Sequence, residues 1–115
     1  MFRILGVIGF IALSSSVSAK TIYCVGKVEN SFIEANGNVH VAGTWHGSWQ
    51  RICNTNDQDA VRCSLWTSYI VTAIQNNLDV TIQYQGVSNE TSCSSLPTYA
   101  SAPQPNYIMV HNAQR

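Results

Sequence analysis

Alternating apolar and polar residues predict a chain of short β-strands. The clearest alternation runs from Leu78 to Gln85, where every second residue is apolar. A similar stretch from Thr21 to Glu34 predicts one long first strand, with Gly26 as a point of sharp bending. The dipeptide Asn36-Gly37 predicts a hairpin turn after it. The remaining strands are expected over residues 38–44, 48–53 and 106–111.

One stretch between the third and fourth strands has a helical period instead. Its apolar residues recur at spacings of three and four, and they form one stripe: Trp66, Tyr69, Ile70, Ala73 and Ile74. Ser64 is a good N-cap residue, and Asn76-Asn77 is a plausible end. The β-branched pair Val71-Thr72 favours a strand as the rival interpretation. The stripe and its two ends decide for a helix.

The order of these elements indicates a fold class. Five strands with a single helix between strands 3 and 4 are typical of the OB-fold, a small five-stranded Greek-key barrel. The sequence therefore predicts an all-β domain with one helix. The prolines at positions 97, 103 and 105 predict an irregular segment before the last strand.

The N-terminus has the pattern of a signal peptide. Arg3 precedes an apolar run from Ile4 to Leu13, and small residues lead to Ala19, after which we expect cleavage. About 10 apolar residues are too few for a membrane anchor, which must cross roughly 30 Å. We therefore expect residues 1–19 to be a cleaved signal peptide, and residues 20–115 to form a single exported domain, periplasmic or secreted, without a membrane span.

The cysteines support an oxidising compartment. Cys24, Cys53, Cys63 and Cys93 lie in the mature chain, and four cysteines in a small exported domain predict two disulfides with three alternative pairings. We favour Cys53–Cys63, which closes a short polar loop, together with Cys24–Cys93. The chain has no C-x-x-C spacing, so we expect no metal site.

Charge excludes one class of partner. The whole chain has six basic and six acidic residues, and removal of Arg3 with the signal peptide leaves five against six, a net charge of −1. The basic residues are scattered, whereas a site for single-stranded nucleic acid needs a positive groove. We therefore expect no nucleic-acid partner.

Candidate chemistry points to binding rather than catalysis. His40, His46 and His111 have no metal-ligand spacing, the acidic residues lie in no catalytic motif, and we expect neither an enzyme nor a cofactor. Trp45 and Trp49 flank a Gly-containing turn, and Trp66 begins the helix. Aromatic faces beside amide and hydroxyl groups are typical of sugar-binding sites, although core packing is the alternative for all three.

Two segments resemble a known family. CVGKVENSFIEANGNVHV, from Cys24, and LWTSYIVTAIQNNLDVTIQYQ, from Leu65, are similar to the first strands and to the helix and fourth strand of Shiga-type toxin binding subunits. Subtilase- and pertussis-like binding subunits share the general plan, and so do small uncharacterised exported bacterial proteins with a C…C…W helix and a proline-rich segment.

The resemblance implies an OB-fold, a pentameric ring and glycan recognition. It places Trp66 at the helix-start tryptophan that contributes to a glycan site in the Shiga-type family, and it matches Cys24 and Cys93 to that family's disulfide. Asn36-Gly37 replaces the family's acidic turn, and the second cysteine pair departs from its pattern.

The expected function is that of a non-enzymatic glycan-binding module resembling a toxin B subunit. Its candidate binding residues are Trp66, Trp45, Trp49 and Asn36. The alternative is a periplasmic or secreted module that binds another protein and no sugar.

Overall fold

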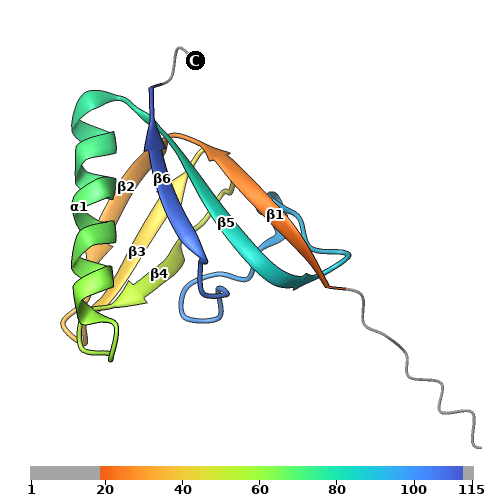
Figure 1. Ribbon diagram of the computed structural model, residues 1–115, viewed down its shortest axis with the longest axis horizontal. Coiled ribbons are helices and arrows are strands. Elements are labelled where there is room, and N and C mark those ends of the chain that lie inside the picture. The colour runs from red at the N-terminus through yellow and green to blue at the C-terminus, as the bar shows by residue number, and fades with distance from the viewer. Residues whose placement is uncertain (1–18, 113–115) are drawn as a thin grey trace, which may run out of the picture.

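The structure is a computed structural model that describes residues 19–112. It is a β-rich domain with one α-helix (Figure 1). In chain order its elements are β1 (Ala19–Gly26), β2 (Val28–Ile33), β3 (Asn38–Gly43), β4 (Gln50–Asn54), α1 (Ala60–Asn76), β5 (Asp79–Ser88), the 3₁₀-helix η1 (Cys93–Ser95) and β6 (Tyr107–His111).

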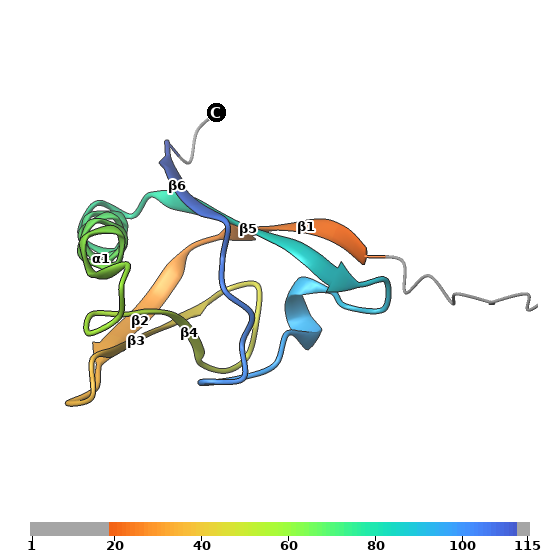
Figure 2. The ribbon, with the colours of Figure 1, turned by 60° about the horizontal axis from the view of Figure 1, so that its bottom comes forward.

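The strands form two antiparallel sheets of three strands each. One sheet has the order β1-β5-β6 and the other has the order β2-β3-β4. Figure 2 shows the two sheets at an angle to each other, with α1 beside β2 and β6 at one end. Apolar side chains from both sheets and from one face of α1 meet between them in a single core.

The prediction of a closed five-stranded OB barrel is therefore wrong, because the described residues form six strands in two open sheets. The expected strand from Thr21 to Glu34 is interrupted at Lys27, and its two halves join different sheets. The backbone N–H of Lys27 donates to Oγ1 of Thr44, and its ammonium group binds Asp79 Oδ1 at 2.9 Å. Alternation continues through this corner, so the pattern alone could not locate the break.

A loop covers the free edge of β4, where a closed barrel would have another strand. The backbone N–H of Tyr99 donates to the carbonyl of Trp49 at 2.7 Å, and the N–H of Arg51 donates to the carbonyl of Tyr99 at 3.1 Å. Tyr99 adopts φ of +51°, in the left-handed region that non-glycine residues seldom occupy. The proline-rich segment is irregular as predicted, and at Tyr99 it lies along the edge of the β2-β3-β4 sheet.

The predicted helix is confirmed, with an earlier start. It begins after Asp59 rather than at Ser64, and the left-handed Asn77 (φ +52°) ends it where expected. Of the predicted stripe, Trp66, Ile70 and Ala73 are buried. The other two members, Tyr69 and Ile74, are exposed because they lie on opposite flanks of that stripe.

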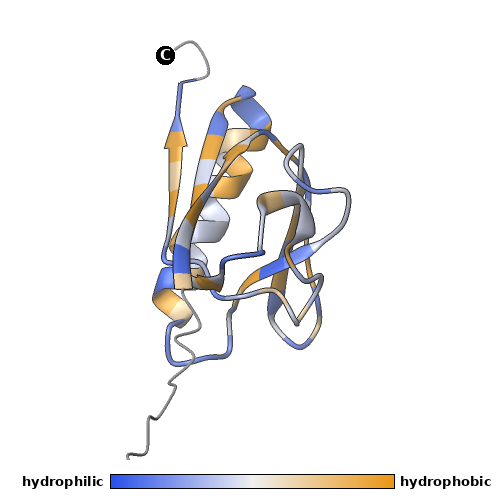
Figure 3. Ribbon diagram, turned by 90° about the vertical axis from the view of Figure 1, so that its right-hand side faces the viewer, coloured by the Kyte–Doolittle hydropathy of each residue, from blue (hydrophilic) through white to orange (hydrophobic). Residues whose placement is uncertain are grey.

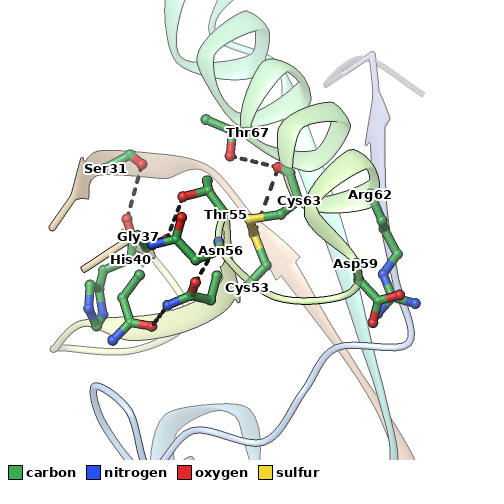
Figure 4. Close-up of a disulfide and its surroundings, with 12 residues drawn as sticks. Ser31, Gly37, His40, Cys53, Thr55, Asn56, Asp59, Arg62, Cys63 and Thr67 are labelled. Carbon is green, nitrogen blue, oxygen red and sulfur yellow. Dashed lines mark hydrogen bonds and ion pairs between the residues drawn. A yellow bond between two sulfur atoms is a disulfide. The ribbon is translucent and has the colours of Figure 1, made fainter. Parts of the chain in front are cut away.

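Both favoured disulfides are present. Cys24–Cys93 joins β1 to η1 across 69 residues of sequence, and Cys53–Cys63 joins β4 to the first turn of α1 across 10 (Figure 4). Two disulfides in a small domain indicate an oxidising, non-cytoplasmic location.

The predicted signal peptide lies outside the described residues apart from Ala19, the first residue of β1. The described part of the chain holds no helix with the length and apolar content of a transmembrane segment.

Tyr84 makes the free energy of unfolding depend on pH. Its side chain is fully buried on β5, and burial raises the pKa of its hydroxyl above the ordinary value of about 10. The unfolded chain therefore releases this proton first as the pH rises. We expect the free energy of unfolding to fall above pH 10 by up to about 1.4 kcal/mol per pH unit relative to the Tyr84→Phe variant.

Urea unfolding followed by circular dichroism between pH 8 and 11.5 measures this difference. The exposed Tyr23 on β1 supplies the control, since Tyr23→Phe should follow the unsubstituted protein across the range. Parallel pH profiles for the Tyr84→Phe variant and the unsubstituted protein would contradict the assignment.

Candidate functional site

An aromatic ledge lies on the face of the β2-β3-β4 sheet that points away from the core. We define it by four residues: Phe32, His40, Trp49 and Tyr99. The hairpin register pairs Phe32 on β2 with His40 on β3, so their side chains share one face. Their rings stack with centroids 4.7 Å apart and planes inclined by 19°.

Two other segments complete the ledge. The Trp49 ring meets the Phe32 ring edge-on at 4.7 Å, and the Tyr99 ring meets the His40 ring at 5.7 Å with an interplanar angle of 63°. Tyr99 reaches this position because its backbone is bonded to the edge of β4. His40 is buried beneath its neighbours at 1% exposure, whereas Phe32 and Tyr99 are exposed and Trp49 is half-buried.

A carboxylate forms the polar rim of the ledge. Glu34 follows β2, and its Oε1 lies 2.6 Å from Nε2 of His40. The Glu34 side chain keeps 42% of its surface exposed. Asn36 lies two residues further on in the same hairpin turn, is exposed, and accepts a hydrogen bond from the N–H of Asn38 through its own Oδ1. Apolar ring surface and hydrogen-bonding groups therefore lie together.

The predicted binding residues separate into two groups. Trp49 belongs to the ledge, and Asn36 lies in the turn beside its rim. Trp45 is buried at 9% exposure, and its Nε1 donates to Oε1 of Gln50 at 3.1 Å. Trp66 is buried at 7% in the core face of α1, where the guanidinium of Arg62 lies 5.2 Å from its ring. The structure does not bring Trp45 or Trp66 to the ledge.

The three histidines lie in different parts of the fold. His40 contacts Glu34, His46 Nε2 lies 2.8 Å from the carbonyl oxygen of Leu96, and His111 Nε2 lies 2.9 Å from Oγ1 of Thr81. Within residues 19–112, no group of three His, Cys, Asp or Glu side chains has the arrangement of a metal site.

The sequence contained a signal for half of the ledge. The turn at Ala35-Asn36-Gly37, with Gly37 in the left-handed region at φ +94°, fixes the hairpin register, and that register places Phe32 opposite His40. The other half had no such signal, because Tyr99 lies two residues after Pro97 in a segment without periodicity.

No protein-family model matches this chain at a significant level, and neither does any curated protein or solved structure.

Proposed function

We propose that this protein is an exported, non-enzymatic module that binds glycans through the aromatic ledge. The observation that carries the proposal is the juxtaposition of the accessible Phe32 and Trp49 rings with the exposed carboxylate of Glu34. Sugar rings have an apolar C–H face and a polar rim of hydroxyl groups. A protein surface with aromatic faces beside a hydrogen-bond acceptor is complementary to both.

The position of the ledge also favours recognition of a large ligand. It lies on the outer face of a sheet, and its residues come from β2, β3, the segment before β4 and the loop that contains Tyr99. An open face of this kind can contact the terminal units of a glycan attached to a cell surface. The two disulfides fit the extracytoplasmic location that such a ligand requires.

Replacing Trp49 by alanine tests this function. We expect the unsubstituted protein to bind at least one group on an array of neutral, amino-sugar and sialylated oligosaccharides. We expect Trp49→Ala and Phe32→Ala to weaken the best interaction at least about tenfold, since each removes a stacking surface worth about 1.4 kcal/mol or more.

The matched control is Tyr23→Ala, which removes a more exposed aromatic ring from β1, on the other sheet. Its affinity should equal that of the unsubstituted protein. An array without any bound glycan would refute the proposed function. So would a Trp49→Ala variant that folds and keeps the full binding profile.

A second candidate function is protein binding without a sugar ligand, with a further copy of this chain as the partner. Exposed apolar side chains flank α1 on both sides. Val61, Leu65 and Tyr69 lie toward β6, and Val71 and Ile74 lie toward β2. Figure 3 shows apolar residues in orange on both the helix and β6.

Both neighbouring strands are sheet edges. β2 and β6 each pair with a single strand among the described residues, and β6 contains no Lys, Arg, Asp, Glu or Pro that would discourage pairing with another chain. Pairing β6 of one copy with β2 of the next is a head-to-tail contact, which closes into a ring if the rotation permits. We propose a pentameric ring as this assembly.

Light scattering distinguishes the two candidates. Five times the monomer mass, reduced to the monomer by Met109→Lys on β6, together with a blank glycan array, would favour the second function. A ring that also binds glycans would unite the two.

A further inference from the structure

We propose that Glu34 is the residue that hydrogen-bonds the ligand at the ledge, and that His40 is the positioning residue that holds its carboxylate there. This inference rests on the proposed glycan-binding function and deepens it. It assigns the ligand a class: a sugar unit whose apolar face is bordered by hydroxyl or amino groups, because a carboxylate only accepts hydrogen bonds and these groups donate them.

The contact between the two side chains is short and unequal in exposure. Nε2 of His40 lies 2.6 Å from Oε1 of Glu34, and the imidazole is buried whereas the carboxylate is 42% exposed. A carboxylate only accepts hydrogen bonds, so Nε2 carries the proton and donates it. One oxygen of Glu34 is thus tied to the protein, and the exposed remainder of the carboxylate can accept hydrogen bonds from a ligand.

The surroundings of His40 fix the direction of that hydrogen bond. Its ring is stacked on Phe32 and bordered by the edge of Tyr99, so the imidazole has little freedom to rotate. Phe32 belongs to the surface on which the ligand would stack. The packing of Phe32 against His40 therefore holds the Glu34 carboxylate in a fixed position relative to the surface on which the ligand would stack.

An imidazole at position 40 lowers the stability of the fold compared with an apolar side chain. Its Nδ1 is buried without a hydrogen-bond partner in the described part of the protein. A buried polar atom without a partner costs about 1–3 kcal/mol, whereas an apolar side chain of similar size avoids that cost. The presence of an imidazole is explained if Nε2 has a function, and its hydrogen bond to Glu34 is such a function.

Calorimetric titration with the best glycan from the array tests the assignment. Glu34→Gln preserves the size of the side chain and removes its charge, and we expect about tenfold weaker binding or more. The matched control Glu29→Gln changes an exposed glutamate on β2, the strand that Glu34 follows, and its affinity should be unchanged. Far-UV circular dichroism and the thermal midpoint verify that each variant folds.

Variants of His40 test positioning as distinct from structural support. His40→Leu removes the donor, and we expect a loss similar to that of Glu34→Gln. His40→Gln keeps an N–H donor near the place of Nε2, and it should recover part of the affinity. In the Glu34→Gln background, His40→Leu should cause little further loss, because the two residues act through one hydrogen bond.

The outcomes separate this inference from the proposed function. If Trp49→Ala abolishes glycan binding and Glu34→Gln binds like the unsubstituted protein, the role of Glu34 is refuted and the ledge remains the site. If losses from Glu34→Gln and His40→Leu add fully, the positioning role of His40 is refuted. If no glycan binds at all, the proposed function itself fails. Should His40→Leu not fold, the comparison of Glu34→Gln with Glu29→Gln still decides the role of Glu34.

Discussion

Replacing both Cys24 and Cys93 by alanine is expected to lower the free energy of unfolding by about 4 kcal/mol. The bond closes a loop of 69 residues, and in the chain-entropy model a long loop restricts the unfolded chain most. A domain of this size has a total stability of about 5–15 kcal/mol. The double variant is therefore expected to unfold at a much lower urea concentration, and a urea titration followed by tryptophan fluorescence measures the change.

The second disulfide provides the matched control. Replacing Cys53 and Cys63 by alanine opens a loop of only 10 residues, so we expect the smaller loss of about 3 kcal/mol. Alanine is preferred to serine in both pairs, since Cys24 and Cys63 are fully buried and a hydroxyl there would lack partners. A larger loss for the short loop than for the long one would contradict the entropic ranking.

The two bonds also differ in what they hold in place. Cys53–Cys63 fixes the start of α1 against β4 (Figure 4). Next to it lies a turn in which the side chains of Asn54 and Asn56 donate to the carbonyl of Asn36. Cys24–Cys93 instead fixes the segment after β5 against β1. That segment leads to Tyr99, one of the four ledge residues. Reduction of the long-range bond is thus expected to disturb the ledge as well as the core.

Local patterns predicted the elements well, because apolar residues recur at every second position in a strand and at every third or fourth position in a helix. The strand ending near Gln85, the helix containing Trp66 and the hairpin at Asn36-Gly37 all depend on neighbours within a few residues. The favoured disulfide pairing, one of three alternatives, is also confirmed: Cys53 and Cys63 bracket a short polar loop, and Cys24 and Cys93 form the other pair.

The architecture could not be predicted from the same patterns. Whether two sheets close into a barrel depends on what occupies the edge of β4, and the sequence gives no period for the loop at Tyr99 that bonds there. The interruption at Lys27 depends on Thr44 and Asp79, which are distant in sequence. These contacts join residues that are distant in sequence. The alternation of apolar and polar residues therefore continues unchanged past Lys27.

The burial of Trp45 also depends on packing that the sequence pattern did not reveal. The Gly-containing turn between Trp45 and Trp49 suggested that Trp45 was accessible, but two other glycines, Gly43 and Gly26, make room for its ring. A Cβ atom at Gly43 would overlap the Trp45 ring, with Cε3 only 2.7 Å away, and a Cβ atom at Gly26 would lie 3.3 Å from the same ring carbon. Gly43 and Gly26 serve here as packing surfaces, whereas the sequence suggested only a bend at Gly26 and a turn between Trp45 and Trp49.

Gly43→Ala is accordingly expected to lower the free energy of unfolding by about 3 kcal/mol, at the upper end of the usual cost of overpacking a core. The cost is steric, since the φ angle of Gly43 is not in the left-handed region. The rigid indole cannot move aside easily, because it is buried and its Nε1 is bonded to Gln50. Urea unfolding measures the loss, and near-ultraviolet circular dichroism reports the displaced ring.

Gly47→Ala is the matched control, four residues away in the connection between β3 and β4. A Cβ atom there meets nothing within 4 Å, so this variant should be as stable as the unsubstituted protein. A second substitution that shortens the buried ring, Trp45→Phe, should restore part of the stability lost in Gly43→Ala, because it removes the overlapping atoms. Equal stability of Gly43→Ala and Gly47→Ala would show that Trp45 does not pack against β3, and would return it to the candidate binding residues.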